Sequence, residues 1–414
     1  MKKNVWIWNH YATNMLENKG GRHYWFAKYL MKMGYSVTIF CASTRHINEK
    51  NIETGKEKYK INSENEIPFV FVKTTAYKDN GVDRVKNMFS FYRNLFPTAK
   101  DYAQKNGKPD VILASSVHPL TLVAGIKIAK KFGVPCICEV RDLWPESLVA
   151  YGALKRNSLF TKLLFFGEKW IYKKADKLIF TIEGGKDYIT DRGWDKDRNG
   201  PVDLEKVHHI NNGVSLETYS FNKENYAIND SDLENQNSFK VIYTGSVRKV
   251  NNVGLILEIA ENLKGQNVEF LIYGDGDHLR ELIMRVELKG LSNVKFKGRI
   301  EKKSIPYVLS KANLNIILGQ SNPVFKYGIS PNKLFEYLAS GRPILSTFKP
   351  EYSLIERFNT GKELETNDSL LICKEILEFK NMHQDEYQEI CNNAKQTSEL
   401  FDYKVLTKKL SKVF

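Results

Sequence analysis

Short apolar runs rich in Val, Ile and Phe alternate along this chain with longer segments of helical period. This alternation is the strongest constraint on the fold, because parallel strands need long crossover connections and those connections are usually helices. The alternation stops at a polar stretch, residues 222–238, which we interpret as a linker or surface loop, and then restarts. The chain is therefore predicted to be an α/β protein with two consecutive doubly wound units.

The length also predicts two domains, because 414 residues exceed what a single hydrophobic core usually organises. We expect a first domain over 1–212, a second over 213–390, and a basic amphipathic helix over 391–414 that packs back on the first. Ligands of open α/β sheets bind at the carboxyl ends of the strands, so a central cleft between the two sheets is expected. The predicted strands are 4–9, 35–43, 68–74, 110–116, 135–142, 177–182, 207–213, 239–245, 268–276, 293–299, 312–319 and 342–348. The helices predicted in the first domain are 20–33, 83–105, 118–132, 156–175 and 184–192.

Charge and cysteine content limit the partners and the compartment. A formal charge of +14 indicates an anionic partner such as nucleic acid, a nucleotide or a membrane surface, or else a basic surface that serves solubility. Five scattered cysteines without a C-x-x-C motif indicate buried, reduced thiols in a cytosolic protein. Because no apolar run reaches about 18 residues, and the N-terminal run is too short for a signal peptide, we expect a soluble or peripherally attached protein.

The stretch GISPNKLFEYLASGRPIL, residues 328–345, predicts a helix that begins at a Ser-Pro pair and ends before an apolar strand. Ser330 is a favoured N-cap, and Pro331 is a favoured first helical residue. The amides of such a helix start bind phosphate, and Glu336 lies where a carboxylate could accept hydrogen bonds from a ribose diol. The alternative is a well-capped helix with an ordinary acid.

Charged residues follow two other predicted strands. Gly245 ends the first strand of the second domain, and Arg248 and Lys249 come next, where two cations can neutralise a departing diphosphate. Arg141 and Asp142 directly follow a buried strand of the first domain, where charged residues are more often functional than structural. The alternatives are a solvated basic loop and an ion pair that only caps a loop.

Gly20 and Gly21 stand between a strand and a helix and are followed by Arg22. Glycine lets a backbone approach a diphosphate or a sugar closely, and a plain loop is the alternative. The Asp-x-Asp triplets at 195–197 and 275–277 imitate a metal motif, but we interpret them as chance, and the second as a turn. Because the histidines also lack ligand spacing, no metal site is predicted.

Two predicted helical segments, 83–96 and 154–174, interleave aromatic residues with Lys and Arg. A basic helix with Leu, Phe and Trp on its other side suits the plane of an anionic membrane. The alternative is an aromatic stripe that faces the core, with a solvated basic face behind it.

Eight segments occur in an order that resembles the retaining glycosyltransferases of family 4, which have the GT-B fold. They are GGRHYWFAKYLMKMGYSVTIF, PDVILASS, EVRDLWPES, KADKLIFTIEGG, INNGV, YTGSVRK, NVKFKGRI and SPNKLFEYLASGRPIL. Within that family the chain is similar to the branch that makes bacterial surface polysaccharides, and to L-fucosamine transferases of O-antigen assembly. The likeness covers nearly the whole chain and implies two Rossmann-like domains facing a central cleft.

The resemblance implies roles for the residues singled out above. The helix start at 330–333 binds the diphosphate of a nucleotide-sugar, Glu336 holds the ribose, and the segment around Arg299 and Ile300 lies along the base. Arg248 and Lys249 take the place of the basic pair that stabilises the leaving diphosphate. The donor-binding residues expected are Gly20, Gly21, Arg22, Arg141, Gly245, Arg299, Ile300, Gly328, Ser330, Pro331, Asn332, Lys333 and Glu336. The catalytic residues expected are Arg248, Lys249, Asp142 and Glu336.

The chain departs from the family pattern at two places. The family often has a second glutamate that touches the donor sugar, eight residues before Glu336, and here that position is Gly328. Sugar recognition must then differ, through the backbone of residues 327–329 or through Lys326. Many members have a sugar-contacting histidine after the first-domain strand, where this chain has Arg141 and Asp142.

The activity implied is transfer of a sugar, an N-acetylated hexosamine or deoxyhexosamine, from a nucleoside-diphosphate sugar to a lipid-diphosphate-linked acceptor. A UDP-sugar is favoured over a GDP-sugar, and no metal, cofactor or nucleic acid is expected. We expect a cytoplasmic protein, peripheral on the inner face of the plasma membrane, that serves O-antigen or capsule synthesis. The alternatives are a sugar-nucleotide 2-epimerase of the same fold and an inactive nucleotide-sugar-binding subunit.

Overall fold

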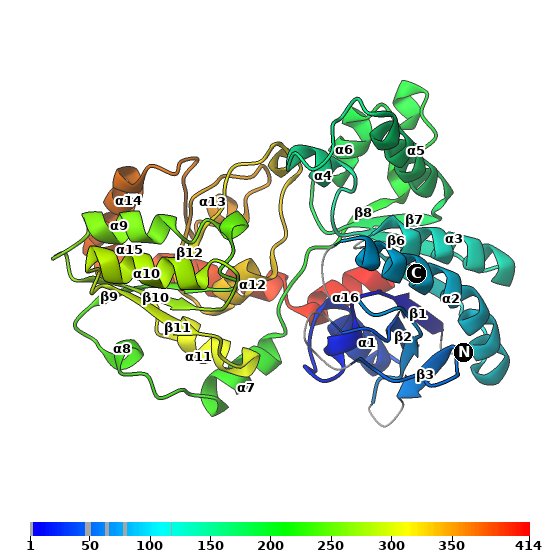
Figure 1. Cartoon of the computed structure of the whole chain (residues 1–414), viewed down its shortest axis with the longest axis horizontal. Helices are drawn as coiled ribbons and strands as arrows, with labels where there is room; N and C mark the ends of the chain where they lie inside the picture. Colours follow the sequence, from blue (N-terminus) through cyan, green and yellow to red (C-terminus); the bar gives the residue numbers. More distant parts are fainter. Residues whose placement is uncertain (1–2, 46–50, 63–65, 78–80, 117) are drawn as a thin grey trace. The chain divides into compact units, whose positions relative to one another are not determined.

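The computed structural model describes residues 3–45, 51–62, 66–77, 81–116 and 118–414, and it divides into two compact units (Figure 1). Unit 1 comprises Met1–Asn211 and Tyr403–Phe414, and unit 2 comprises Asn212–Asp402. Each unit contains one sheet of mainly parallel strands connected by helices. The predicted α/β class, with two doubly wound units in succession, is confirmed.

The sheet of unit 1 has the order β3-β4-β2-β1-β5-β6-β7-β8, and β3 alone among the described strands of this sheet pairs antiparallel. In register, Ile7 of β1 lies beside Ile39 of β2 and Leu113 of β5, and all three side chains are fully buried. Continuous apolar runs form these strands because both faces of a parallel sheet are covered. The strands are β1 (Asn4–Trp8), β2 (Ser36–Ala42), β3 (Tyr59–Asn62), β4 (Phe69–Val72), β5 (Val111–Ser115), β6 (Cys136–Val140), β7 (Lys177–Phe180) and β8 (Val207–His209).

Local signals define the helices of unit 1. Pro119 opens α3 and Gly133 in the left-handed region ends it, while the Ser158 hydroxyl caps α5 by accepting from the Thr161 amide. The α-helices are α1 (Arg22–Lys32), α2 (Val82–Asn106), α3 (Pro119–Phe132), α4 (Glu146–Ala150), α5 (Leu159–Lys174), α6 (Gly185–Asp191) and α16 (Tyr403–Ser411). The 3-10 helices are η1 (Thr13–Met15), η2 (Lys196–Arg198) and η3 (Leu204–Lys206).

The sheet of unit 2 is parallel throughout its described strands, in the order β11-β10-β9-β12-β13-β14. Its strands are β9 (Phe239–Thr244), β10 (Val268–Tyr273), β11 (Val294–Gly298), β12 (Leu314–Ile317), β13 (Ile344–Ser346) and β14 (Gly361–Glu363). Its α-helices are α7 (Leu216–Asn225), α8 (Ser231–Glu234), α9 (Leu255–Asn262), α10 (Leu279–Lys289), α11 (Ile305–Ser310), α12 (Asn332–Ala339), α13 (Leu354–Arg357), α14 (Ser369–Asn381) and α15 (Gln384–Leu400). The 3-10 helices are η4 (Lys249–Asn251), η5 (Lys302–Ser304) and η6 (Pro323–Tyr327).

The polar stretch 222–238 differs from the predicted linker or surface loop. It contains the end of α7 and all of α8, and it is attached to the sheet by ion pairs. Lys297 Nζ lies 2.7 Å from Asp230 and also pairs with Asp232, while Tyr273 donates a 2.8 Å hydrogen bond to Asp230. Polar residues of this stretch therefore attach it to the sheet. Amino-acid composition alone does not distinguish such residues from polar residues that face solvent.

The predicted boundary at residue 391 falls inside α15, which buries Ile390, Cys391 and Ala394 in unit 2. The segment that returns to unit 1 is the shorter Tyr403–Phe414, and its helix α16 lies against α1 (Figure 1). There the Tyr403 and Phe26 rings meet edge to face at 5.5 Å. The amphipathic pattern continues through α15 and α16, so the sequence does not indicate where α15 ends and α16 begins.

Glu168 is an acid buried inside unit 1, on α5. Burial raises the pKa of its carboxyl to about 8, although Tyr172 and Tyr188 each donate to it a hydrogen bond of 2.7 Å, which acts in the opposite direction. Between the ordinary glutamate pKa of 4.5 and about 8, the folded protein therefore holds a proton on Glu168 that the unfolded chain has already released. The stabilising contribution of this proton is full below the unfolded pKa and is lost as pH rises through about 8.

We expect wild-type protein to lose stability between pH 6 and pH 8.5, by at most about 1.4 kcal/mol per pH unit from this group. Glu168→Gln removes the titration, so its melting temperature should change less across the same range. Thermal melts at closely spaced pH values measure this. Glu205→Gln, at an exposed acid of unit 1, is the matched control and should follow wild type; identical pH profiles for Glu168→Gln and wild type would contradict the assignment.

Candidate active site

Two backbone loops touch at the carboxyl edge of the unit 2 sheet, after β9 and after β10. Gly245 donates a backbone hydrogen bond to Tyr273, and Val247 donates one of 2.9 Å to Asp275. A Cβ atom added to Gly274 would lie only 1.7 Å from the Gly245 carbonyl oxygen. Glycine is therefore required at 274 for close backbone approach, and the Asp-x-Asp sequence at 275–277 belongs to this turn.

The start of α12 lies at the same edge. Pro331 is the N-cap residue, so the predicted Ser330 cap is wrong, and the helix begins at Asn332. The Ser330 hydroxyl accepts from the Asn212 amide at 2.9 Å, and the Ser330 carbonyl accepts from the Asn212 side chain at 2.6 Å. Ser330 thus holds a neighbouring loop of unit 2, and the first amides of α12 lack intrahelical acceptors, as at every helix start.

Lys333 joins α12 to the end of β9. Its Nζ lies 3.2 Å from the Tyr243 hydroxyl, 4.3 Å from the centre of the Tyr243 ring, and 2.9 Å from where a Cβ on Gly245 would stand. Gly245 also has φ of +140°, so both space and backbone conformation favour glycine. Burial lowers the pKa of Lys333 to about 8, while Glu336 acts to raise it. A second contact, 2.9 Å from the Thr244 amide to the Tyr337 hydroxyl, holds the same two elements together.

Glu336 retains access to solvent. Its side chain is 25% exposed, and Oε1 lies 3.6 Å from Lys302 Nζ. Tyr219 of α7 is buried, and both burial and the charge of Glu336 raise its pKa. Its hydroxyl has no hydrogen-bond partner among the described residues. Sequence reasoning did not identify Lys302 and Tyr219 as neighbours of Glu336. The charged run Glu301-Lys302-Lys303, close after Arg299, was the signal that could have indicated Lys302.

Other predicted residues of unit 2 lie at the same edge. Arg248 and Lys249 are exposed beside the start of η4, and Arg299 is exposed after β11, while Ile300 packs partly against the core. The Gly274 amide donates to the Gly298 carbonyl at 2.8 Å, which ties the β11 loop to the other two.

A polar pocket of about 290 Å³ opens beside Lys249 in unit 2. The start of α9 contributes Gly254, and side chains with nitrogen donors come from Asn252, His278 and Arg285. Cationic and amide groups around a helix start are the chemistry that binds anions. Lys249 therefore adjoins a space with donors around it, which the carboxylate of Glu258 also lines.

Gly328, where the family often has its second glutamate, follows η6 with φ of +87°. An added Cβ would meet ordinary contacts, the nearest at 3.5 Å, so space does not exclude a side chain. The left-handed backbone is what disfavours any residue other than glycine. The loop conformation thus gives a physical reason for the missing acid.

In unit 1, Gly21 is the N-cap of α1 with φ of +102°, Gly20 precedes it half-buried, and Arg22 enters an interior ionic network. Arg22 Nε donates to Glu139 at 2.8 Å, and its other nitrogens donate to the carbonyls of residues 210 and 211. His23 lies 2.8 Å from the same carboxylate. Burial acts to raise the pKa of Glu139, but Arg22 and His23 outweigh burial and hold it well below its ordinary value. Arg22 is thus committed to protein groups, which differs from the direct donor contact predicted from the Gly-Gly-Arg pattern.

Arg141 and Asp142 follow β6, as predicted. The Arg141 amide donates to the Ser116 hydroxyl at 3.1 Å, and the Arg141 carbonyl accepts from Thr181 at 3.1 Å, so the backbone is fixed. Arg141 Nε is buried and has no hydrogen-bond partner among the described residues, and Asp142 is exposed.

Two buried histidines lie near the same sheet edge, and sequence spacing did not identify them as a pair. His10, after β1, lies 2.6 Å from His118 through Nδ1 and 2.7 Å from Asn87 through Nε2. Burial lowers the pKa of His10, and it lowers the pKa of His118 to about 3. Both imidazoles are consequently neutral at physiological pH.

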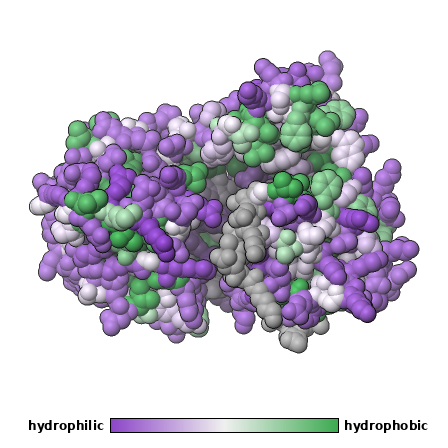
Figure 2. Space-filling view, viewed as in Figure 1, coloured by the Kyte–Doolittle hydropathy of each residue, from purple (hydrophilic) through white to green (hydrophobic). Residues whose placement is uncertain are grey.

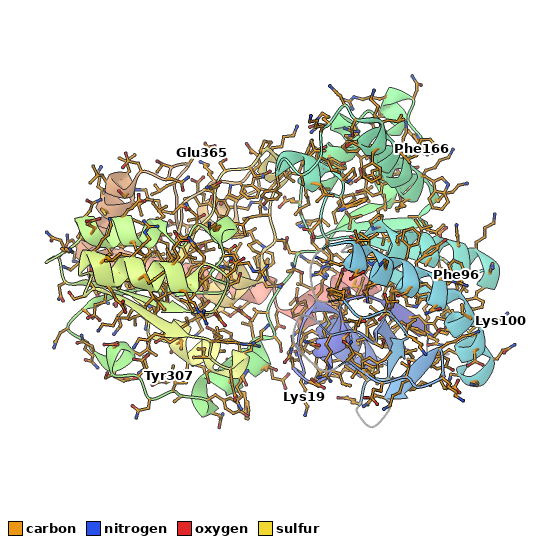
Figure 3. All side chains as sticks on the ribbon, viewed as in Figure 1. Lys19, Phe96, Lys100, Phe166, Tyr307 and Glu365 are labelled. Atoms are coloured by element: carbon orange, nitrogen blue, oxygen red, sulfur yellow. The ribbon has the colours of Figure 1, made fainter. Side chains whose placement is uncertain are left out.

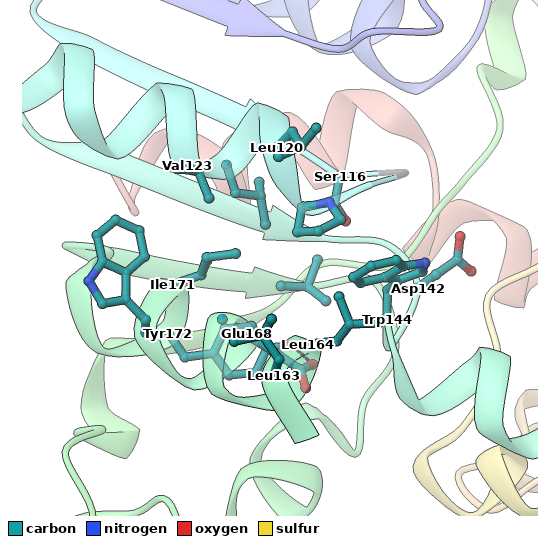
Figure 4. A pocket seen from close by; sticks show the side chains of 15 residues that line it. Ser116, Leu120, Val123, Asp142, Trp144, Leu163, Leu164, Glu168, Ile171 and Tyr172 are labelled. Atoms are coloured by element: carbon teal, nitrogen blue, oxygen red, sulfur yellow. Dashed lines mark hydrogen bonds between the residues drawn. The ribbon is translucent and has the colours of Figure 1, made fainter. Parts of the chain in front are cut away.

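An apolar cavity of about 200 Å³ lies in unit 1 between α3 and α5, over β6 (Figure 4). Leu120 and Val123 of α3 point toward Leu163 and Leu164 of α5 across it. Asp142 stands at one end, so this cavity reaches the predicted residues of unit 1.

The described part of the chain shows neither a metal-ligand cluster nor a helix that could cross a membrane. No group of three or more His, Cys, Asp or Glu side chains is arranged there to hold a metal ion. None of the helices described is long and apolar enough to span a bilayer. All five cysteines are buried and free of disulfides.

Family models match both units. Residues 24–218 match the model described as Glycosyltransferase Family 4, and residues 238–378 match the model described as Glycosyl transferases group 1. The two matches lie on either side of the polar stretch that docks on the unit 2 sheet.

Two curated relatives are similar in sequence. The chain is 26% identical over 267 residues to a putative teichuronic acid biosynthesis glycosyltransferase, TuaH, of Bacillus subtilis, covering 64% of this chain and 63% of TuaH. It is 22% identical over 281 residues to the probable glycosyltransferase WbjE of Pseudomonas aeruginosa, covering 65% of this chain and 66% of WbjE. The similarity thus spans slightly less than two thirds of each relative.

Solved structures resemble the whole chain in fold. Sucrose-phosphate synthase from Thermosynechococcus elongatus aligns with a TM-score of 0.72 at 15% identity, covering 99% of this chain and 98% of the synthase. Anabaena HepE in complex with UDP and glucose aligns with a TM-score of 0.66 at 14% identity, covering 100% and 99%. The fold is therefore the GT-B fold, and both halves of the chain match glycosyltransferase family models.

Proposed function

We propose that the protein is a retaining glycosyltransferase that moves a sugar from a nucleoside-diphosphate sugar to a lipid-linked glycan. The observation that carries this proposal is the assembly at the carboxyl edge of the unit 2 sheet, where Gly245, the start of α12, Lys333 and Glu336 converge. The family matches and the relatives favour glycosyl transfer in general.

The assembly suits a nucleoside diphosphate for a physical reason. The first amides of α12 and the Lys333 ammonium present positive charge to a diphosphate, with Pro331 and Asn332 fixing the entry to the helix. Glu336, partly exposed, can accept hydrogen bonds from a ribose diol. The backbone near Gly328 is proposed to contact the donor sugar, in place of the glutamate that the family often has at this position.

We propose that the nucleobase of the donor lies along the loop after β11. Ile300 would contact this nucleobase through its apolar side chain, and Arg299 would lie at the edge of the nucleobase site. A UDP-sugar is favoured because the HepE structures are described with UDP and with UDP-glucose.

Stabilising the leaving diphosphate is the main contribution that this chain makes to the reaction. Arg248 and Lys249 are placed to neutralise the charge that develops as the sugar–phosphate bond breaks. In a front-face reaction with retention, a leaving phosphate oxygen accepts the proton of the acceptor hydroxyl, so no separate base is required. We propose that the reaction proceeds without a metal ion.

Unit 1 is proposed to bind the acceptor. Asp142 is exposed after β6 and can orient an acceptor hydroxyl by accepting its hydrogen bond, while Arg141 offers a cation beside it. Arg22 acts indirectly, by fixing Glu139 at the end of β6. The name of TuaH, which refers to teichuronic acid biosynthesis, favours a role in polysaccharide synthesis, and O-antigen or capsule with an N-acetylated hexosamine is the specific form that we propose.

We further propose that unit 1 attaches peripherally to an anionic membrane through α5. Phe160, Leu163 and Phe166 are exposed along this helix, and Lys162 and Lys169 alternate with them. Figure 3 labels Phe166 on the outer side of α5. Apolar side chains that enter the headgroup layer, with cations beside them, are the usual means of such attachment.

Glu336→Ala should weaken UDP binding by about 10- to 100-fold, because a hydrogen bond to a charged group contributes about 1.5–3 kcal/mol. Isothermal titration calorimetry with UDP measures the effect. Glu287→Ala, at an exposed acid of α10, is the matched control. Equal affinities for Glu336→Ala and wild type would remove Glu336 from the donor site.

Arg248→Ala and Lys249→Ala should each reduce the turnover number by about 10²- to 10³-fold, with a smaller effect on UDP affinity, because the charge they stabilise is greatest in the transition state. Release of UDP from a panel of UDP-sugars, with a membrane extract as acceptor, measures turnover. Arg280→Ala, at an exposed arginine of α10, is the control. Formation of an isomeric sugar-nucleotide without acceptor would instead favour the epimerase, and unchanged turnover in both variants would exclude the assigned role.

Replacing both Phe160 and Phe166 by serine should lower binding to vesicles with phosphatidylglycerol by about tenfold or more, because two aromatic side chains leave the interface. Vesicle sedimentation at fixed ionic strength measures this. Phe221→Ser, at an exposed phenylalanine of unit 2, should bind like wild type. Equal sedimentation of all three proteins would show that α5 is not the attachment surface.

A further inference from the structure

The apolar cavity of unit 1 is not required by any step proposed so far. It lies between α3 and α5 with a volume of about 200 Å³, and most of its lining is aliphatic or aromatic (Figure 4). A space of this size and chemistry inside a folded unit suits an apolar ligand, because polar ligands need several convergent donors and acceptors.

The polar side chains of the cavity are few and are mainly committed elsewhere. The carboxyl group of Glu168 accepts hydrogen bonds from Tyr172 and Tyr188, and it holds a proton at neutral pH. The Ser116 hydroxyl accepts from the Arg141 amide. Asp142 is exposed at one end (Figure 4). The buried part of the lining is thus uncharged, and the charged side chain of Asp142 lies at one end, where β6 ends.

The cavity wall continues into the outer surface of α5. Leu163 lines the cavity and is also 63% exposed, and Phe160 and Phe166 extend the same apolar surface along the helix. Figure 2 shows hydrophobic side chains gathered over this part of unit 1. The apolar lining of the cavity and the exposed apolar surface of α5 therefore meet at Leu163.

Cations lie near this apolar surface. Lys155, Lys162 and Lys169 lie on or just before α5, and Arg141, which precedes the cavity-lining Asp142 in the chain, has a buried Nε without a hydrogen-bond partner in the described residues. A ligand that is apolar along its length and anionic at its head matches both features.

We propose that this cavity binds the hydrocarbon chain of the lipid-diphosphate-linked acceptor, which leaves the diphosphate and its glycan at the end of β6 beside Arg141 and Asp142. The inference rests on the proposed function, since it names where the acceptor of that reaction is held. The volume accommodates the part of the chain next to the diphosphate, and the remainder lies along the exposed apolar surface of α5.

Gly167 allows a direct test. It lines the cavity from α5, one helical turn from Leu163 and Leu164, and a Cβ added there meets no atom within 4 Å. Gly167→Leu therefore has room to fold and fills the space. Val123→Phe fills it from α3, and Gly167→Ala is the matched control that changes helix propensity without filling the cavity.

The probes are radiolabelled farnesyl diphosphate and isopentenyl diphosphate, which share a head group and differ in chain length, measured by equilibrium dialysis. Wild type and Gly167→Ala should bind the farnesyl compound about tenfold or more tightly than the isopentenyl compound, because each buried methylene adds affinity. Gly167→Leu and Val123→Phe should lose that preference, while their melting temperatures and UDP affinity remain those of wild type. Excess short-chain phosphatidylglycerol, kept monomeric below its micelle-forming concentration, should leave farnesyl binding in the wild type unchanged.

Equal binding of the two probes by the wild type, or unchanged preference in both filled variants, would overturn the proposal. Displacement by this monomeric lipid would also overturn it, because the occupant would then be a membrane lipid chain. If UDP fails to bind while the farnesyl preference and its loss are observed, the donor site is wrong but the cavity assignment is supported.

Discussion

Close backbone contact between the loops after β9 and β10 is the constraint on which the unit 2 site depends. Gly274 must lack a side chain because the Gly245 carbonyl occupies the place of a Cβ, and the hydrogen bond from Val247 to Asp275 fixes the approach. With these loops in place, Lys333 can reach Tyr243 and the start of α12 is held at the end of β9. The cationic loop at 248–249 takes its position from the same contact. The polyanion site that we propose in this Rossmann-like sheet thus depends on backbone geometry more than on any single side chain.

Unit 1 fixes the corresponding sheet edge by a different means. Arg22, His23 and Glu139 are buried together, and the charges are paired with each other and with two backbone carbonyls. Removing one partner would leave an uncompensated buried charge, which typically costs about 3–5 kcal/mol. The network connects the start of α1, the end of β6 and the chain near residue 210. Arg141 and Asp142 follow β6 directly, and the charge of Arg141 acts on both Glu139 and His23.

Periodicity predicted the fold well because it reports burial directly. Runs such as residues 110–116 and 239–245 are apolar since both faces of a parallel sheet are covered, and the structure has β5 and β9 there. The edge strand β3 was not predicted, because half-exposed edge residues lack that signal. The candidate site residues could be located because they follow the carboxyl ends of predicted parallel strands. The predicted topology alone is enough to identify those ends. The partners of Ser330 and Arg22 could not be predicted, because Asn212 and Glu139 are distant in sequence and nothing local indicates which polar groups will pair.

The division of unit 1 has a consequence for how the chain acquires its structure during synthesis. The face of α1 that packs against α16 is completed only by Tyr403–Phe414, which the ribosome produces after the whole of unit 2. The apolar surface around Phe26 consequently stays open to solvent, or to a chaperone, while nearly two hundred further residues are added. Unit 2 is contiguous in sequence and can therefore reach its final packing before unit 1 is complete.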